Sequence, residues 1–129
     1  MARQDPDIGE AELETLKVLW DRGRSTVRDV MNALHEQGRD VAYTTVQTTL
    51  TRLEQKGVVS SNKSGLSFVY RARVSRDRIA RARLERLIEQ LFDGVPGSLV
   101  LQLMKTERFS PDELAAFQKL IEDLDADRE

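Results

Sequence analysis

The chain has 129 residues, of which 40% are hydrophobic and 33% charged, which is typical of one compact domain or of a domain with a small appendage. Its longest apolar run, residues 114–117, is far too short to cross a membrane, and the polar, acid-containing start predicts no signal peptide. Without cysteine and with one histidine, the chain is predicted to form no disulfide and no thiolate or histidine-rich metal site. We therefore expect a cytoplasmic protein without cofactor, metal or membrane insertion.

Charge is distributed unevenly along the chain, although the formal net charge is only −2. Residues 1–40 carry a net −3, residues 41–86 carry ten basic and three acidic side chains for a net +7, and residues 87–129 carry a net −6. A basic middle segment with acidic flanks can place positive potential on one surface while the whole chain remains soluble. The alternative is that these charges lie on ordinary solvated helix faces.

Three amphipathic helices are predicted before the hairpin. The first spans residues 10–21, where apolar residues recur at three- and four-residue spacing, namely Leu13, Leu16, Leu19 and Trp20. The second begins near Thr26, which has Asp29 at the spacing of a capping box, and it ends at Gly38. The third covers roughly residues 44–56, with an apolar stripe on one side.

After Gly57 the apolar period changes from helical to extended. Val58 and Val59, a polar tip at residues 60–65 and an apolar run at residues 66–70 predict a two-stranded β-hairpin.

Helical spacing returns after Ser75 and predicts a long fourth helix, a short fifth and a sixth that starts at Ser110, just before a proline. The order of elements predicts a mainly α fold with a small β-hairpin wing. We assign residues 1–74 to a winged helix-turn-helix domain and residues 75–129 to a three-helix dimerisation region.

The outer face of the third helix is rich in threonine and lacks acids. Threonine has poor helix propensity, so this composition calls for a local reason. Threonine methyls can contact thymine methyls, glutamine can bond adenine in bidentate fashion, and arginine suits a phosphate. We therefore predict that this helix enters the major groove of double-stranded DNA, and the competing interpretation is that the threonines pack against neighbouring residues. The predicted contacts on this helix are Thr44, Thr45, Gln47, Thr48, Thr51 and Arg52.

The hairpin tip is small, polar and basic, as is required of a wing that contacts backbone phosphate or the minor groove. Lys63 is the cation at this tip, and we add it to the predicted DNA-binding residues. Most hairpin tips are polar, so this feature does not by itself separate a DNA-binding wing from an ordinary turn.

The last three helices are predicted to pair with a second copy. A unit of this size leaves much apolar surface exposed, which is covered either by folding back on the first domain or by a two-fold homodimer, and we favour the homodimer. A dimer also places two recognition helices about one DNA turn, ~34 Å, apart. The predicted dimerisation residues are Leu84, Leu87, Ile88, Leu91, Leu99, Leu103, Leu114, Phe117, Leu120 and Ile121.

Over nearly its whole length the sequence resembles the penicillinase repressor (BlaI/MecI/CopY) family. The most specific part is YTTVQTTLTRLEQKG at residues 43–57, with VLW at 18–20 and FVY at 68–70 on either side. The resemblance implies a dimeric repressor that binds near-palindromic operators through its winged helix. It places Thr44, Thr45, Gln47 and Thr48 at base-facing positions and Thr51 and Arg52 near the DNA backbone.

The resemblance also bears on how the repressor is released. In the antibiotic-resistance branch, a membrane-bound sensor with a zinc metalloprotease domain triggers cleavage of an Asn–Phe bond in the fifth helix. Gln102 and Leu103 stand at the matching place, so this candidate protease-sensitive bond departs from the family pattern. The copper branch carries a C-terminal cysteine motif, and this cysteine-free chain cannot sense copper in that way.

The predicted function is a repressor that leaves its operator when the dimer is lost. One alternative is a winged-helix module that binds proteins and no DNA. Another is a small-molecule-responsive regulator with an apolar pocket between its domains. No nucleophile–base pair, phosphate-binding glycine loop or metal cluster is visible in the sequence, so we do not expect an enzyme.

Overall fold

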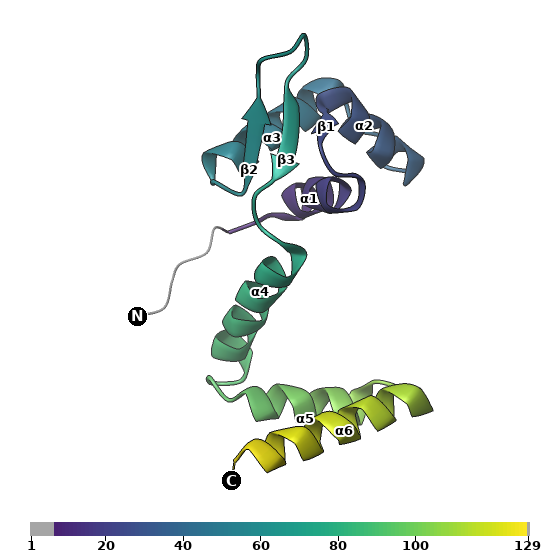
Figure 1. The fold of residues 1–129 in the computed structure, drawn as a ribbon, viewed down its shortest axis with the longest axis vertical. Coiled ribbons are helices and arrows are strands. Elements are labelled where there is room, and N and C mark those ends of the chain that lie inside the picture. The colour runs from purple at the N-terminus through teal and green to yellow at the C-terminus, as the bar shows by residue number, and fades with distance from the viewer. Residues whose placement is uncertain (1–6, 129) are drawn as a thin grey trace. The chain divides into compact units, whose positions relative to one another are not determined.

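The computed structural model describes residues 7–128, and it has the mainly α fold with a small antiparallel sheet that the sequence predicts (Figure 1). In this part of the chain, no helix is both long and apolar enough to cross a membrane. The elements in chain order are α1 (Glu10–Arg22), β1 (Ser25–Thr26), α2 (Val27–Glu36), α3 (Tyr43–Gln55), β2 (Val59–Asn62), β3 (Val69–Ala72), α4 (Arg76–Leu91), α5 (Pro96–Thr106) and α6 (Pro111–Asp127).

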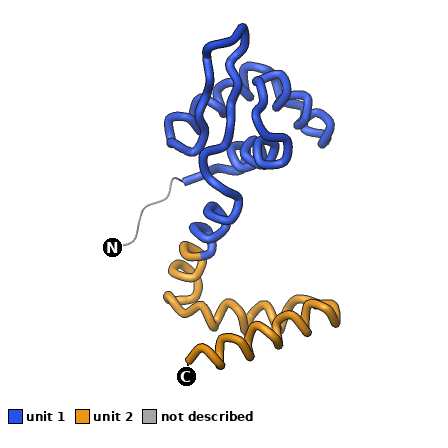
Figure 2. The backbone as a smooth tube through the Cα atoms, in the orientation of Figure 1, with its two compact units in different colours: residues 1–84 blue, residues 85–129 orange. Residues whose placement is uncertain are grey.

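The chain divides into two compact units, residues 1–84 and residues 85–129 (Figure 2). The division falls inside α4 rather than after residue 74, where the apolar period changes. The start of α4 belongs to the first unit because Ile79 is buried in its core, at 6% exposure. The change of apolar period in the sequence marks only the end of the last strand. The compact unit continues as far as side chains of α4 pack against its core.

The core of the first unit is formed where α1, α2 and α3 meet the sheet. Leu16 of α1, Val30 of α2 and Leu50 and Leu53 of α3 are fully enclosed. Burying a side chain of this kind contributes about 1.5–3 kcal/mol. The apolar stripes predicted for these helices therefore face the core, and each helix exposes its opposite side.

Local hydrogen bonds fix where the second helix begins. Thr26 Oγ1 accepts from the Asp29 backbone N–H at 3.1 Å, and Asp29 Oδ2 accepts from the Thr26 backbone N–H at 3.0 Å. This reciprocal pair is the predicted capping box. The last helix begins in the same way, because Ser110 Oγ accepts from the Glu113 N–H.

The sheet has three strands in the order β1-β3-β2, all antiparallel. The predicted two-stranded hairpin is therefore incomplete, because Ser25 of β1 also pairs with Tyr70 of β3. The predicted tip is also misplaced: residues 63–68, not residues 60–65, connect β2 to β3. Leu66, expected in the second strand, is fully exposed in this turn. Polar residues form most of β2 because one side of this edge strand faces solvent.

In the second unit, α5 and α6 form a helical hairpin (Figure 1). The rings of Phe109 and Phe117 pack edge to face beside the connection, with centroids 5.1 Å apart. The fifth helix, Pro96–Thr106, is longer than the short helix predicted. Neither α5 nor α6 has a buried residue, so their apolar faces are uncovered in the single chain.

Candidate nucleic-acid interface

The predicted reading face of α3 is exposed to solvent. All six predicted contacts on this helix are exposed, whereas Val46, Leu50 and Leu53 on the other side are buried. Thr49, which is not among the predicted contacts, is the threonine of α3 that lies in the core, at 8% exposure. The interpretation in which the predicted contacts pack inside the protein is therefore wrong. The exposed contacts are Thr44, Thr45, Gln47, Thr48, Thr51 and Arg52.

Two threonines of this face have oriented hydroxyl groups. Thr48 Oγ1 donates to the Thr44 carbonyl and Thr51 Oγ1 donates to the Gln47 carbonyl, both at 2.9 Å. Because the hydroxyl hydrogen is used inside the helix, these side chains offer a methyl group and oxygen lone pairs to a ligand. Lone pairs can accept from the amino groups of adenine or cytosine, whereas a phosphate needs a donor. This arrangement suits Thr48 to a base edge, whereas Thr51 can approach the DNA backbone through its methyl group.

The one acid of α3, Glu54, is engaged by the hairpin. Ser61 Oγ donates to Glu54 Oε2 at 2.6 Å, and the glutamate side chain is half-buried. Burial of the Tyr70 hydroxyl, and next the negative charge of Glu54, raise the pKa of Tyr70 above its ordinary value. At the other end of the helix, the Arg28 guanidinium lies 6.0 Å from the centre of the Tyr43 ring, within cation–π range. The exposed face of α3 thus carries no carboxylate and has cations beside it.

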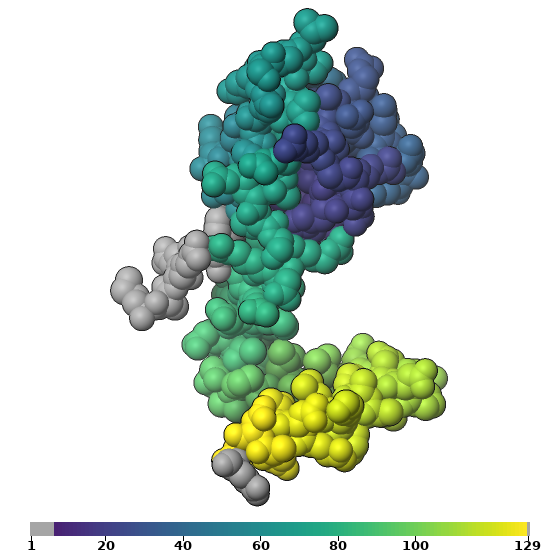
Figure 3. Space-filling view, in the orientation of Figure 1, coloured from purple at the N-terminus to yellow at the C-terminus, as the bar shows by residue number. Residues whose placement is uncertain are grey.

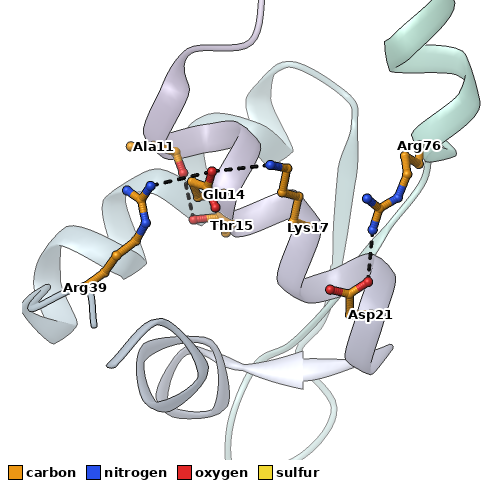
Figure 4. A network of polar contacts seen from close by, with 7 residues as sticks. All are labelled: Ala11, Glu14, Thr15, Lys17, Asp21, Arg39 and Arg76. Atoms are coloured by element: carbon orange, nitrogen blue, oxygen red, sulfur yellow. Dashed lines mark hydrogen bonds and ion pairs between the residues drawn. The ribbon is translucent and has the colours of Figure 1, made fainter. Parts of the chain in front are cut away.

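Acids of α1 pair with cations of the same helix, of the loop after α2 and of α4 (Figure 4). Glu14 lies 3.4 Å from Lys17 and 3.6 Å from Arg39, and Asp21 lies 2.9 Å from Arg76. Exposed pairs of this kind contribute at most about 1 kcal/mol each. Their main consequence here is to confine uncompensated positive charge to the rest of the unit.

Several cations of the first unit form no ion pair with any described residue. Across residues 7–128, no carboxylate lies within ion-pair distance of Arg28, Arg52 or Lys63. The same is true of Arg24 and Arg71, which line a depression beside Lys63. The sequence prediction missed these two arginines. Strand alternation next to the buried Tyr70 would indicate that Arg71 faces outward, but the position of Arg24 depends on β1, which the pattern did not reveal.

A partly enclosed ion pair ties the residue after α3 to the first turn of α1. Lys56 Nζ lies 2.8 Å from Glu12 Oε1, the Gly9 N–H donates to the same oxygen at 2.9 Å, and the glutamate side chain is 12% exposed. Burial acts to raise the pKa of Glu12, but the hydrogen bonds from Lys56 and Gly9 and the positive charge of Lys56 and Arg52 outweigh it and lower the pKa below its ordinary value. The ionised pair therefore helps to hold the recognition helix in place.

The hairpin protrudes from the body of the first unit as a wing (Figure 3). Lys63 is exposed at its tip, and the Lys63 ammonium lies 5.2 Å from the centre of the Phe68 ring. A cation on a protruding hairpin beside an exposed polar helix is the arrangement that a DNA-binding wing requires. Between residues 7 and 128, no cluster of three or more His, Asp or Glu side chains could hold a metal ion.

The predicted dimerisation residues are all accessible in the single chain. Leu87, Ile88, Leu99 and Phe117 are half-buried. The other six are exposed by 43% or more. These exposed positions are Leu84, Leu91, Leu103, Leu114, Leu120 and Ile121.

The candidate protease-sensitive bond lies within a regular helix. Gln102 and Leu103 are exposed in α5. Because a protease binds its substrate in an extended conformation, α5 has to unfold locally before this bond can be cleaved.

A helical core, an outward polar third helix and a flanking β-hairpin together define a winged helix-turn-helix protein. The sequence model of the family described as penicillinase repressor matches residues 8–123. The chain therefore belongs to the penicillinase repressor family.

Individual relatives agree with this assignment. The chain is 26% identical over 118 residues to the penicillinase repressor of Bacillus licheniformis, covering 92% of this chain and 91% of that protein. It is 26% identical over 115 residues to the methicillin resistance regulatory protein MecI of Mammaliicoccus sciuri, covering 89% and 93%. The solution structure of the DNA binding domain of the repressor BlaI matches with a TM-score of 0.50 and 32% identity, covering 58% of this chain and 90% of that chain.

Proposed function

We propose that this protein is a cytoplasmic transcriptional repressor, not an enzyme, that binds a near-palindromic operator as a homodimer with α3 in the major groove. The observation that carries the proposal is the exposed, hydroxyl-rich face of α3, which carries no carboxylate because Ser61 holds Glu54, the one acid of the helix. Membership of the penicillinase repressor family supports it, as do relatives that are named repressors.

Each residue of the face has a role that fits its chemistry. Thr44, Thr45, Gln47 and Thr48 contact base edges, and a good bidentate contact such as glutamine to adenine contributes about 1–3 kcal/mol of discrimination. Thr51 and Arg52 lie near the DNA backbone and Lys63 contacts phosphate from the wing, so these residues position the protein without reading sequence.

Dimerisation through the last three helices couples the two reading sites. The predicted interface residues of this region are accessible, and no residue of α5 or α6 is fully buried in the single chain. Losing the dimer discards two-site binding, which often strengthens affinity by about 10²-fold or more. Cleavage of the Gln102–Leu103 bond by a membrane-bound sensor metalloprotease is one release route, and any other signal that weakens the helical interface has the same effect.

The test is to select duplexes from a random pool with the full chain. The wild type should enrich an inverted repeat, and Gln47→Ala should enrich a motif that is degenerate at one position in each half. Gln118→Ala, on α6, is the matched control and should select the wild-type motif. If the wild-type chain enriches no sequence, the proposal is wrong and a winged-helix protein-interaction module becomes the better account.

A further inference from the structure

A basic depression lies on the solvent-exposed side of the three-stranded sheet, beside the hairpin. Its volume is about 660 Å³. Its lining combines three cations with hydroxyl and amide groups and only one apolar side chain. The lining residues are Arg24, Ser60, Ser61, Asn62, Lys63, Val69 and Arg71.

Strand pairing explains why these side chains converge. Arg71 of β3 lies directly opposite Ser60 of β2, so both side chains emerge on the same side of the sheet. Arg71 Nε donates to Ser60 Oγ at 3.2 Å, which orients the guanidinium. Arg24 immediately precedes β1, and the pairing of β1 with β3 brings it to the same depression.

The charge of the depression is uncompensated within the described part of the chain. Arg24, Lys63 and Arg71 have no carboxylate at ion-pair distance there, whereas Arg22, Arg39 and other cations of the same unit do. Like charges that share a site repel one another, and a bound anion relieves this repulsion. Guanidinium, ammonium and hydroxyl donors around one hollow are the groups that bind phosphate oxygens.

We propose that this depression binds a phosphate group through Arg24, Lys63 and Arg71. Two sources present that group: the backbone of duplex DNA beside the operator, and a free phosphorylated small molecule. If DNA is the source, the inference rests on the proposed function and extends the contact with DNA beyond α3. If a small molecule is the source, the site shares only Lys63 with the proposed DNA contacts.

The experiment compares Arg24→Gln and Arg71→Gln with Arg81→Gln in the full chain. Arg81 is an exposed arginine of α4 that pairs with Asp77 and lies outside the depression, so its substitution controls for the loss of one positive charge. The first arm measures duplex affinity against salt concentration. Each lost phosphate contact should reduce the slope of log affinity against log salt by about 1.

The second arm titrates inorganic phosphate at constant ionic strength and follows backbone amide shifts by NMR. Saturable shifts centred on residues 60–62 and 71, absent from both depression variants and present in Arg81→Gln, support the site.

The two arms separate the sources of phosphate. If both depression variants have a reduced slope of log duplex affinity against log salt, the phosphate belongs to the DNA backbone. If they lose the NMR response to phosphate but keep the wild-type slope, the ligand is a free phosphate ester. If both variants match Arg81→Gln in both arms, the inference is wrong. If the wild type binds no duplex at all, the proposed function fails and the phosphate titration alone decides the inference.

Discussion

Replacing Leu120 with alanine tests whether α6 forms the dimer interface. Leu120 is 59% exposed in the single chain. Full burial of a leucine contributes about 1.5–3 kcal/mol, so covering the exposed part contributes roughly 1–2 kcal/mol per copy. A two-fold interface contains the residue twice, which raises the expected loss to roughly 2–3.5 kcal/mol. The dimer dissociation constant should therefore rise by roughly 25- to 300-fold.

Sedimentation equilibrium of Leu120→Ala measures the dimer dissociation constant directly. Leu101→Ala, measured in the same way, is the control. Leu101 is 61% exposed, but on α5 it lies on the opposite face from Leu99 and Leu103, because each residue advances the helix by about 100°. Leu101→Ala should change the dissociation constant by no more than about twofold, as surface substitutions usually do. Equal dissociation constants for Leu120→Ala and Leu101→Ala would refute the placement of the interface, and so would intact dimers of Leu120→Glu.

Three further predictions concern the first unit. Gln47→Ala should reduce discrimination between the preferred duplex and one altered at a single base pair by about 5- to 150-fold, or about 1–3 kcal/mol, in a competition assay; undiminished discrimination would exclude direct reading by Gln47. Thr26→Ala should lower the free energy of unfolding in urea by about 0.5–2 kcal/mol because the Asp29 N–H loses its cap, and Thr26→Ser should restore it; if alanine and serine behave alike, the cap is not stabilising. The folded-state pKa of Glu12 lies below its ordinary value of 4.5, so its contribution to stability is complete above about that pH and is lost as the pH falls through the lower folded value. Glu12→Gln should remove that part of the pH dependence, and an unchanged curve of unfolding free energy against pH would count against the ion pair with Lys56.

The helices of the first unit could be predicted because their signals are local. Apolar residues at three- and four-residue spacing identify the buried sides of α1, α2 and α3. The capping box at Thr26 is likewise a pattern within four residues. The same periodicity separated the exposed threonines of α3 from the buried Thr49.

Features that depend on distant segments could not be predicted in this way. The two-residue strand β1 is too short to show a period, and it exists because β3 pairs with it. The register of β2 and β3 is set by pairing across the turn, so polar Ser60 takes a strand position and Leu66 does not. The depression around Arg24 follows from that pairing. The ion pair between Glu12 and Lys56 joins residues with no shared local pattern.

The measurement that tests the central claim most directly is the affinity of the full chain for its selected duplex as a function of salt, with Thr48→Glu beside the wild type. If the exposed face of α3 receives duplex DNA, wild-type affinity should fall linearly on a log–log plot; six to ten phosphate contacts would cost about 10³–10⁵-fold between about 50 and 200 mM salt. Thr48→Glu should abolish sequence-specific binding while leaving the fold intact, because it places a carboxylate on that face. A wild-type affinity that is independent of salt, or a Thr48→Glu variant that binds as tightly as the wild type, would contradict the account.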